Sequence, residues 1–120
     1  MQVVIVSARK EALHDFAQGL EADIEWTESP ESVLERARTA PWQLVVVDGL
    51  TPGMNYKVFV MDLLRVNAMI NTMVVTDMGE EEFHEDSEGL GVICAVPASP
   101  GREDGRRSMD MLRQLPGLGL

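Results

Sequence analysis

Two kinds of hydrophobic pattern alternate along the chain. Short runs of consecutive apolar residues, rich in valine and isoleucine, are typical of strands that are buried on both faces of a sheet. Between them lie stretches in which apolar residues recur every three or four positions, as in amphipathic helices. The short runs predict strands within 2–8, 23–29, 42–48, 72–78 and 91–97. The intervening stretches predict helices within 10–22, 29–40, 56–69, 80–90 and 99–115.

Local signals refine several of these elements. The second strand alternates apolar and polar residues, which predicts that it is more exposed than the others. Ser29 is a good N-cap and Pro30 suits the first helical position. Ser99 and Pro100 predict a similar start for the last helix, although Gly105 leaves that start open. The strongly apolar third helix is expected to carry Val58, Met61, Leu64 and Ala68 on one side.

Strict alternation of strands and helices indicates the fold. Such βα units form a parallel sheet with helices on both faces, joined by right-handed crossovers. We predict an α/β, flavodoxin-like, doubly wound (βα)5 fold with strands in the order 2-1-3-4-5. No repeat or linker divides the sequence, so residues 1–120 are predicted to form a single domain.

The composition excludes several classes of function. Twenty acidic residues against ten basic ones give a net charge of −10, which would repel a phosphate backbone and argues against nucleic-acid binding. The acidic stretch 79–89 is interpreted as a solvated surface, with a docking surface for a basic partner as the alternative. One cysteine excludes an internal disulfide. No signal peptide or apolar run of about 20 residues is visible, so we expect a cytoplasmic protein without a membrane span.

Asp48 is the first candidate for chemistry, because it ends the most hydrophobic strand of the chain. A buried carboxylate is costly unless it is paired or hydrogen-bonded. In open α/β sheets the carboxyl ends of the strands, called the rim below, are also where binding sites lie. The predicted strand order places Asp48 beside Ser7 and Ala8. Arg9 and Lys10 follow directly, and both are predicted ion-pair partners of Asp48.

The stretch DGLTPGMN, residues 48–55, resembles a motif of the receiver domain of two-component response regulators, and the resemblance covers essentially the whole chain. It implies that Asp48 stands in the phospho-acceptor position. The family also has a Thr or Ser after the fourth strand, matched by Thr76, and a Lys-Pro pair after the fifth. Pro97 matches that proline, and the peptide before it is commonly cis in the family.

Other positions depart from the family pattern. Ser7 and Ala8 stand where receivers carry two acids that help to hold Mg²⁺, and Val96 stands where they carry a lysine. All these differences remove charge that phosphoryl transfer uses. We therefore expect a pseudo-receiver without a cofactor, in which Asp48 is vestigial, acting in signal transduction through protein contact rather than as an enzyme.

Two alternatives remain open. One is a working single-domain response regulator in a phosphorelay, which accepts phosphate on Asp48 from a histidine kinase and requires Mg²⁺. The other is a small-ligand module that uses Ser7, Thr76 and Asn55 at the rim. An enzyme is not expected, since no glycine-rich phosphate loop or Ser-His-Asp arrangement is visible.

The resemblance also suggests which surface meets a protein partner, a histidine kinase or a downstream signalling protein. In receivers it is often the fourth helix, fifth strand and fifth helix. We expect the same surface to support a weak homodimer that loosens at high salt, because exposed ion pairs are screened. The residues predicted to build it are Phe83, Ile93, Met109 and Leu112.

Overall fold

The computed structural model describes residues 1–115 and confirms the predicted order of elements. The strands are β1 (Gln2–Val6), β2 (Asp23–Thr27), β3 (Leu44–Asp48), β4 (Asn71–Val75) and β5 (Val92–Val96). The helices are α1 (Lys10–Leu20), α2 (Pro30–Arg36), α3 (Tyr56–Val66), α4 (Glu80–Asp86) and α5 (Arg102–Arg113). None of these helices is long and apolar enough to cross a membrane.

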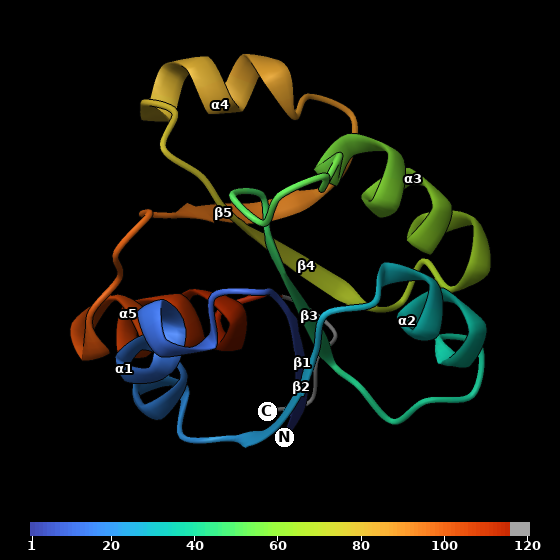
Figure 1. Cartoon of the computed structure of the whole chain (residues 1–120), viewed down its shortest axis with the longest axis horizontal. Helices are drawn as coiled ribbons and strands as arrows, with labels where there is room; N and C mark the ends of the chain where they lie inside the picture. The colour runs from blue at the N-terminus through green and yellow to red at the C-terminus, as the bar shows by residue number, and fades with distance from the viewer. Residues whose placement is uncertain (116–120) are drawn as a thin grey trace.

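The strands form one parallel sheet in the predicted order, β2-β1-β3-β4-β5. β3 lies in the middle, between β1 and β4, and all five of its residues are buried. In register, Val6 of β1 lies opposite Val47, so Ser7 follows β1 at the level where Asp48 ends β3. The fold therefore brings the ends of β1 and β3 together at the rim (Figure 1).

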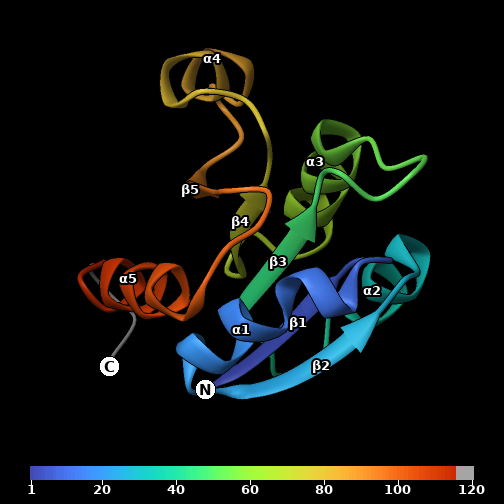
Figure 2. The ribbon, with the colours of Figure 1, turned by 60° about the vertical axis from the view of Figure 1, so that its left-hand side comes forward.

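Helices cover both faces of the sheet, as Figures 1 and 2 show. Because side chains alternate along a strand, Val3 and Ile5 of β1 face one core, and Val4 and Val6 face the other. The first core is closed by Leu13, Phe16, Leu20, Met109 and Leu112 of α1 and α5. The second is closed by Val33, Phe59, Val60, Leu63 and Phe83 of α2, α3 and α4.

The structure corrects the predicted start of α5. Ser99 and Pro100 precede the helix, which begins at Arg102 after the N-cap Gly101. The backbone N–H of Gly101 donates to the Asp104 carboxylate at 2.8 Å. This bond fixes the first turn where a serine N-cap was expected. Gly105 lies well inside the helix and is buried against α1.

The side of α3 on which its apolar residues were expected is not the side that covers the sheet. Val58 and Met61 are 54% and 44% exposed, whereas Tyr56, Phe59, Val60 and Leu63 are buried. Asn55 caps the helix through Val58 N–H at 3.3 Å, so the helix begins at Tyr56. Both faces carry apolar residues, and the sheet is covered by the face with the aromatic side chains. The hydrophobic pattern alone does not distinguish two such faces.

Candidate functional site

Asp48 is fully buried at the end of β3, and hydrogen-bond donors surround its carboxylate. Its Oδ2 accepts from the Ser7 hydroxyl at 2.7 Å and from Arg9 Nε at 2.8 Å. Its Oδ1 accepts from Arg9 Nη2 at 2.8 Å and from the backbone N–H of Leu50 at 3.0 Å. A carboxylate offers about four acceptor positions. Donors from the same chain thus occupy two acceptor positions on each carboxylate oxygen.

The Arg9 guanidinium makes Asp48 a stable anion. Burial by itself would raise the pKa of Asp48, but the bonds from Arg9, Ser7 and the Leu50 N–H outweigh it and hold this pKa below its ordinary value. The hydrogen bond to Asp48 raises the pKa of Arg9 against the opposing effect of burial. Two parallel N–H···O bonds between an arginine and a carboxylate also fix their relative geometry. The two groups form a charged, oriented pair.

Arg9 connects three segments of the chain at the rim. It follows β1 and pairs with Asp48 at the end of β3, and its Nη1 donates to the backbone carbonyl of Ala98 at 3.2 Å, in the segment between β5 and α5. Lys10, the other predicted partner, lies elsewhere: its Nζ is 5.3 Å from the centroid of the Trp26 ring. Of the two predicted ion-pair partners, Arg9 contacts Asp48 and Lys10 does not pair with it.

Ser7 and Ala8, which directly follow β1, support this arrangement. The buried Ser7 hydroxyl accepts the Arg9 backbone N–H at 2.8 Å and donates to Asp48, so it bridges the two residues. Ala8 is exposed, and its backbone N–H donates to the Thr51 hydroxyl at 3.1 Å. That bond holds the loop after Asp48 beside the end of β1. The hydroxyl of Ser7 is therefore committed to the ion pair.

Among residues 1–115, the remaining predicted rim residues make no hydrogen bond to the Asp48 carboxylate. Thr76 is buried, and its hydroxyl accepts the Met78 N–H at 3.1 Å; no hydrogen bond within residues 1–115 joins it to Asp48. Val96 is 1% exposed and packs in the core beneath α1 and α5. Pro97 is exposed, and the peptide before it is trans, unlike the cis peptide common in the family.

The donors around Asp48 do not fit Mg²⁺, the ion that the family resemblance would imply. Mg²⁺ requires about six oxygen ligands in near-octahedral geometry and is usually held by one or two carboxylates together with water or phosphate. Here a single carboxylate is hydrogen-bonded on both oxygens, and a guanidinium lies against it. Nowhere in residues 1–115 do three or more Asp, Glu, His or Cys side chains gather as a metal site would need.

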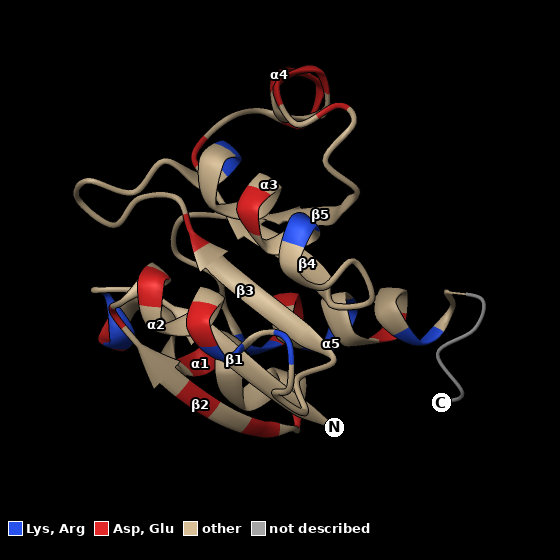
Figure 3. Ribbon diagram, turned by 90° about the vertical axis from the view of Figure 1, so that its right-hand side faces the viewer, with Lys and Arg blue, Asp and Glu red and all other residues tan. Residues whose placement is uncertain are grey.

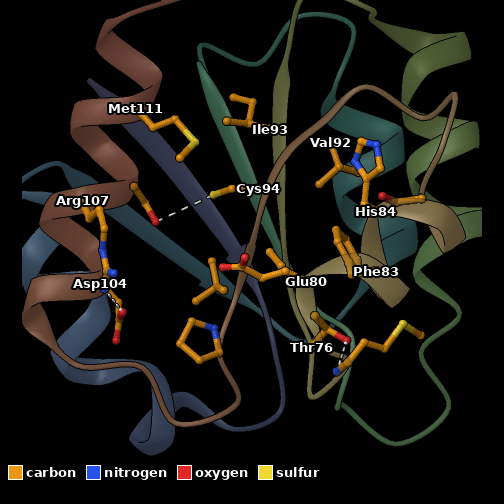
Figure 4. Close-up of a pocket in the computed structure, with 16 residues that line it drawn as sticks. Thr76, Glu80, Phe83, His84, Val92, Ile93, Cys94, Asp104, Arg107 and Met111 are labelled. Atoms are coloured by element: carbon orange, nitrogen blue, oxygen red, sulfur yellow. Dashed lines mark hydrogen bonds and ion pairs between the residues drawn. The ribbon is translucent and has the colours of Figure 1, made fainter.

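A groove lies on the same molecule between α4 and α5, with β5 as its floor (Figure 4). It encloses about 460 Å³. Glu80, Phe83 and His84 line it from α4, and Asp104, Arg107, Ser108 and Met111 line it from α5. Its floor includes Ile93 and Cys94, both partly buried. Burial raises the pKa of the Cys94 thiol, whose Sγ lies 3.9 Å from Ser108 Oγ.

The groove corrects the surface predicted for partner contact. Met109 and Leu112, which were assigned to that surface, are buried in the core between α5 and the sheet. Phe83 is 5% exposed and mainly fills the core under α4. Met111, which is 41% exposed, lines the groove from α5 instead. The helical repeat predicts which positions of α5 are apolar, but it does not show which of them face the sheet.

Sequence reasoning also missed a cluster that joins α3 to α4. The Tyr56 hydroxyl donates to Asp86 Oδ2 at 2.6 Å, and Lys57 Nζ lies 2.6 Å from Asp86 Oδ1. The Tyr56 and Phe83 rings are in contact, with centroids 5.6 Å apart. Residues this far apart in sequence carried no shared pattern. An aromatic residue and a lysine directly after the Asn55 cap were the only local signal.

No family model matches the sequence, and no curated protein matches it. Solved structures do. A two-component response regulator from Clostridium difficile has a TM-score of 0.77 at 12% identity, over 98% of this chain and 99% of that one. One from Legionella pneumophila has a TM-score of 0.75 at 14% identity, over 96% and 99%.

A third solved structure is a CheY-like response regulator receiver domain protein from Methanospirillum hungatei JF-1. Its TM-score is 0.73 at 16% identity, over 94% of each chain. At such low identity the likeness concerns the backbone rather than the site residues. The chain therefore has the CheY-like, flavodoxin-type (βα)5 fold of receiver domains, over nearly the full length of these structures.

Proposed function

We propose that this protein is a receiver-like signalling module that acts by protein contact and is not switched by Mg²⁺-dependent phosphorylation. The observation that carries the proposal is the pairing of Asp48 with Arg9. The guanidinium supplies, from within the chain, the positive charge that a metal ion would otherwise bring to this carboxylate. In this protein the charge is permanent, because an arginine does not lose its proton at physiological pH.

The chemistry of phosphoryl transfer supports the same conclusion. An aspartate attacks a phosphoryl donor with a carboxylate oxygen, which must approach the phosphorus in line. Each carboxylate oxygen of Asp48 already accepts two hydrogen bonds. The transferring group also needs cations to neutralise its equatorial oxygens. Val96, buried in the core, cannot provide one.

The groove between α4 and α5 is the surface that we assign to the protein partner, either a histidine kinase or a downstream signalling protein. It combines an apolar floor with charged groups on both sides, as protein interfaces often do. The weak homodimer stays a prediction. Two arginines of α5 are paired with acids of the same helix: Arg106 with Glu103 and Arg107 with Asp104.

A Mg²⁺ titration tests the metal part of this proposal. We expect amide resonances of residues 6–10 and 48–52 to stay unchanged at millimolar Mg²⁺, because no second carboxylate is available to replace bound water. The matched variant combines Ser7→Asp, Ala8→Asp and Arg9→Ala, which adds two acids and frees Asp48. We expect it to show saturable shifts at the rim. Saturable binding at the rim of the unmodified protein would contradict the proposal.

A further inference from the structure

α4 is too short to be stable without contacts to the rest of the protein. It has seven residues, and its N-cap is Gly79, which provides no side-chain capping bond. Helices this short are not stable alone in water, so tertiary contacts must keep α4 in place. Figures 1 and 2 show α4 standing apart from α5, with β5 between them. Whatever fixes α4 also fixes one wall of the groove.

The side of α4 that faces the body is held by a few side chains. Phe83 is buried under the helix and contacts the Tyr56 ring. Within residues 1–115, the side-chain hydrogen bonds and ion pairs that join α4 to another element both end on Asp86: one from Tyr56 and one from Lys57. The other acids of α4 are exposed, and Figure 3 shows acidic residues along most of this helix. Asp86 therefore differs from its acidic neighbours in having partners.

The two partners of Asp86 lie at the start of α3, close to the rim. Tyr56 and Lys57 open α3, directly after the loop that leaves Asp48. That loop is itself fixed to the rim by the Leu50 N–H on Asp48 and by the Thr51 hydroxyl, which accepts the Ala8 N–H. The start of α3 is thus held at the rim, and α4 is held by the start of α3. Glu80, Phe83 and His84 of α4 then form the groove wall.

We propose that Asp86 is a positioning residue, whose bonds to Tyr56 and Lys57 hold α4 against α3 and set the width of the groove over β5. Loss of these bonds releases α4 while the sheet, α1 and α5 keep their packing. The inference rests on the proposed function only for the role of the groove in partner contact. The position of α4 can be measured in the free protein, without a partner.

Hydrogen exchange of the free protein tests this inference. In Asp86→Ala, we expect amides of residues 80–90 to exchange roughly five- to tenfold faster, because one ion pair and one charge-assisted hydrogen bond are lost. Amides of α1, β1 and β3 should keep their rates. Glu85→Ala is the matched control, since it removes the same charge from an exposed neighbour in the same helix. Tyr56→Phe keeps the ring and loses only the hydroxyl, so an intermediate increase is expected.

The groove itself is measured at Cys94, the single cysteine of the chain, which lies on its floor. A neutral thiol reagent should label Cys94 severalfold faster in Asp86→Ala than in Glu85→Ala. Equal exchange of residues 80–90 in these two variants would overturn the proposal, as would a uniform increase along the chain. Faster exchange in α4 with unchanged Cys94 labelling would overturn its claim about groove width. None of these results would touch the proposed role of Arg9 at Asp48.

Discussion

Replacing Arg9 by alanine is expected to lower the free energy of unfolding by about 2–4 kcal/mol, as when one partner of a buried ion pair is removed. Asp48 is fully buried and would lose two of its four hydrogen bonds together with its counter-charge. The loss should fall below the top of the range for buried pairs, because the Arg9 side chain is 27% exposed and water can enter. Urea unfolding at neutral pH measures the change.

Two further variants separate the ion pair from nonspecific effects. Arg9→Ala combined with Asp48→Ala removes both charges and should restore about 1–2 kcal/mol of that loss, because no unpaired buried carboxylate remains. Arg65→Ala makes the same side-chain change in an exposed pair with Asp62 and should cost less than about 0.5 kcal/mol. Equal losses for Arg9→Ala and Arg65→Ala would show that Arg9 does not stabilise Asp48.

Gly105→Ala is expected to destabilise the protein by about 2–3 kcal/mol, since overpacking of a core contact has a cost of this size. A Cβ at this position would lie 2.1 Å from the carbonyl oxygen of Phe16 in α1, and the two helices would have to separate. The contact is with backbone, which no rotamer change relieves. Thermal unfolding measures the loss of stability, and a crystal structure of the variant measures the change in the distance between α1 and α5.

The matched control for this helix contact is Gly101→Ala. A Cβ on Gly101 meets nothing within 4 Å, and its backbone is extended, so only the weaker N-cap preference of alanine is felt. We expect a loss of less than about 1 kcal/mol. In an exposed helix interior, by contrast, glycine to alanine usually stabilises by up to about 1 kcal/mol. A gain in stability for Gly105→Ala would mean that α1 and α5 do not pack as closely as described.

The fold was predictable because each strand run was short and the helix stretches alternated regularly with the strands. α3 shows the limit of this reasoning. Its two faces are both apolar, and only the tertiary structure decides that Phe59 and Leu63 face the sheet while Val58 and Met61 do not. Gly105 shows a second limit. In sequence it weakens a helix, whereas its purpose in the fold is to allow backbone contact with α1.

The candidate site was predictable only in outline. The end of β3 and its neighbours followed from strand order, but Arg9 and Lys10 were equivalent by adjacency alone. The structure distinguishes them because Arg9 precedes α1 and turns toward Asp48, whereas Lys10 begins the helix and lies over Trp26. The bond from Arg9 to the Ala98 carbonyl joins residues 89 positions apart and had no local signal.

The central claim is that Arg9 holds Asp48 in a state that does not accept phosphate. Incubation with acetyl phosphate and Mg²⁺, followed by intact-protein mass spectrometry, tests it most directly. We predict that the mass stays unchanged, because both carboxylate oxygens are hydrogen-bonded and no bound metal assists the attack. A mass increase of one phosphate on the unmodified protein, absent in Asp48→Asn, would contradict the account and identify a working phospho-acceptor.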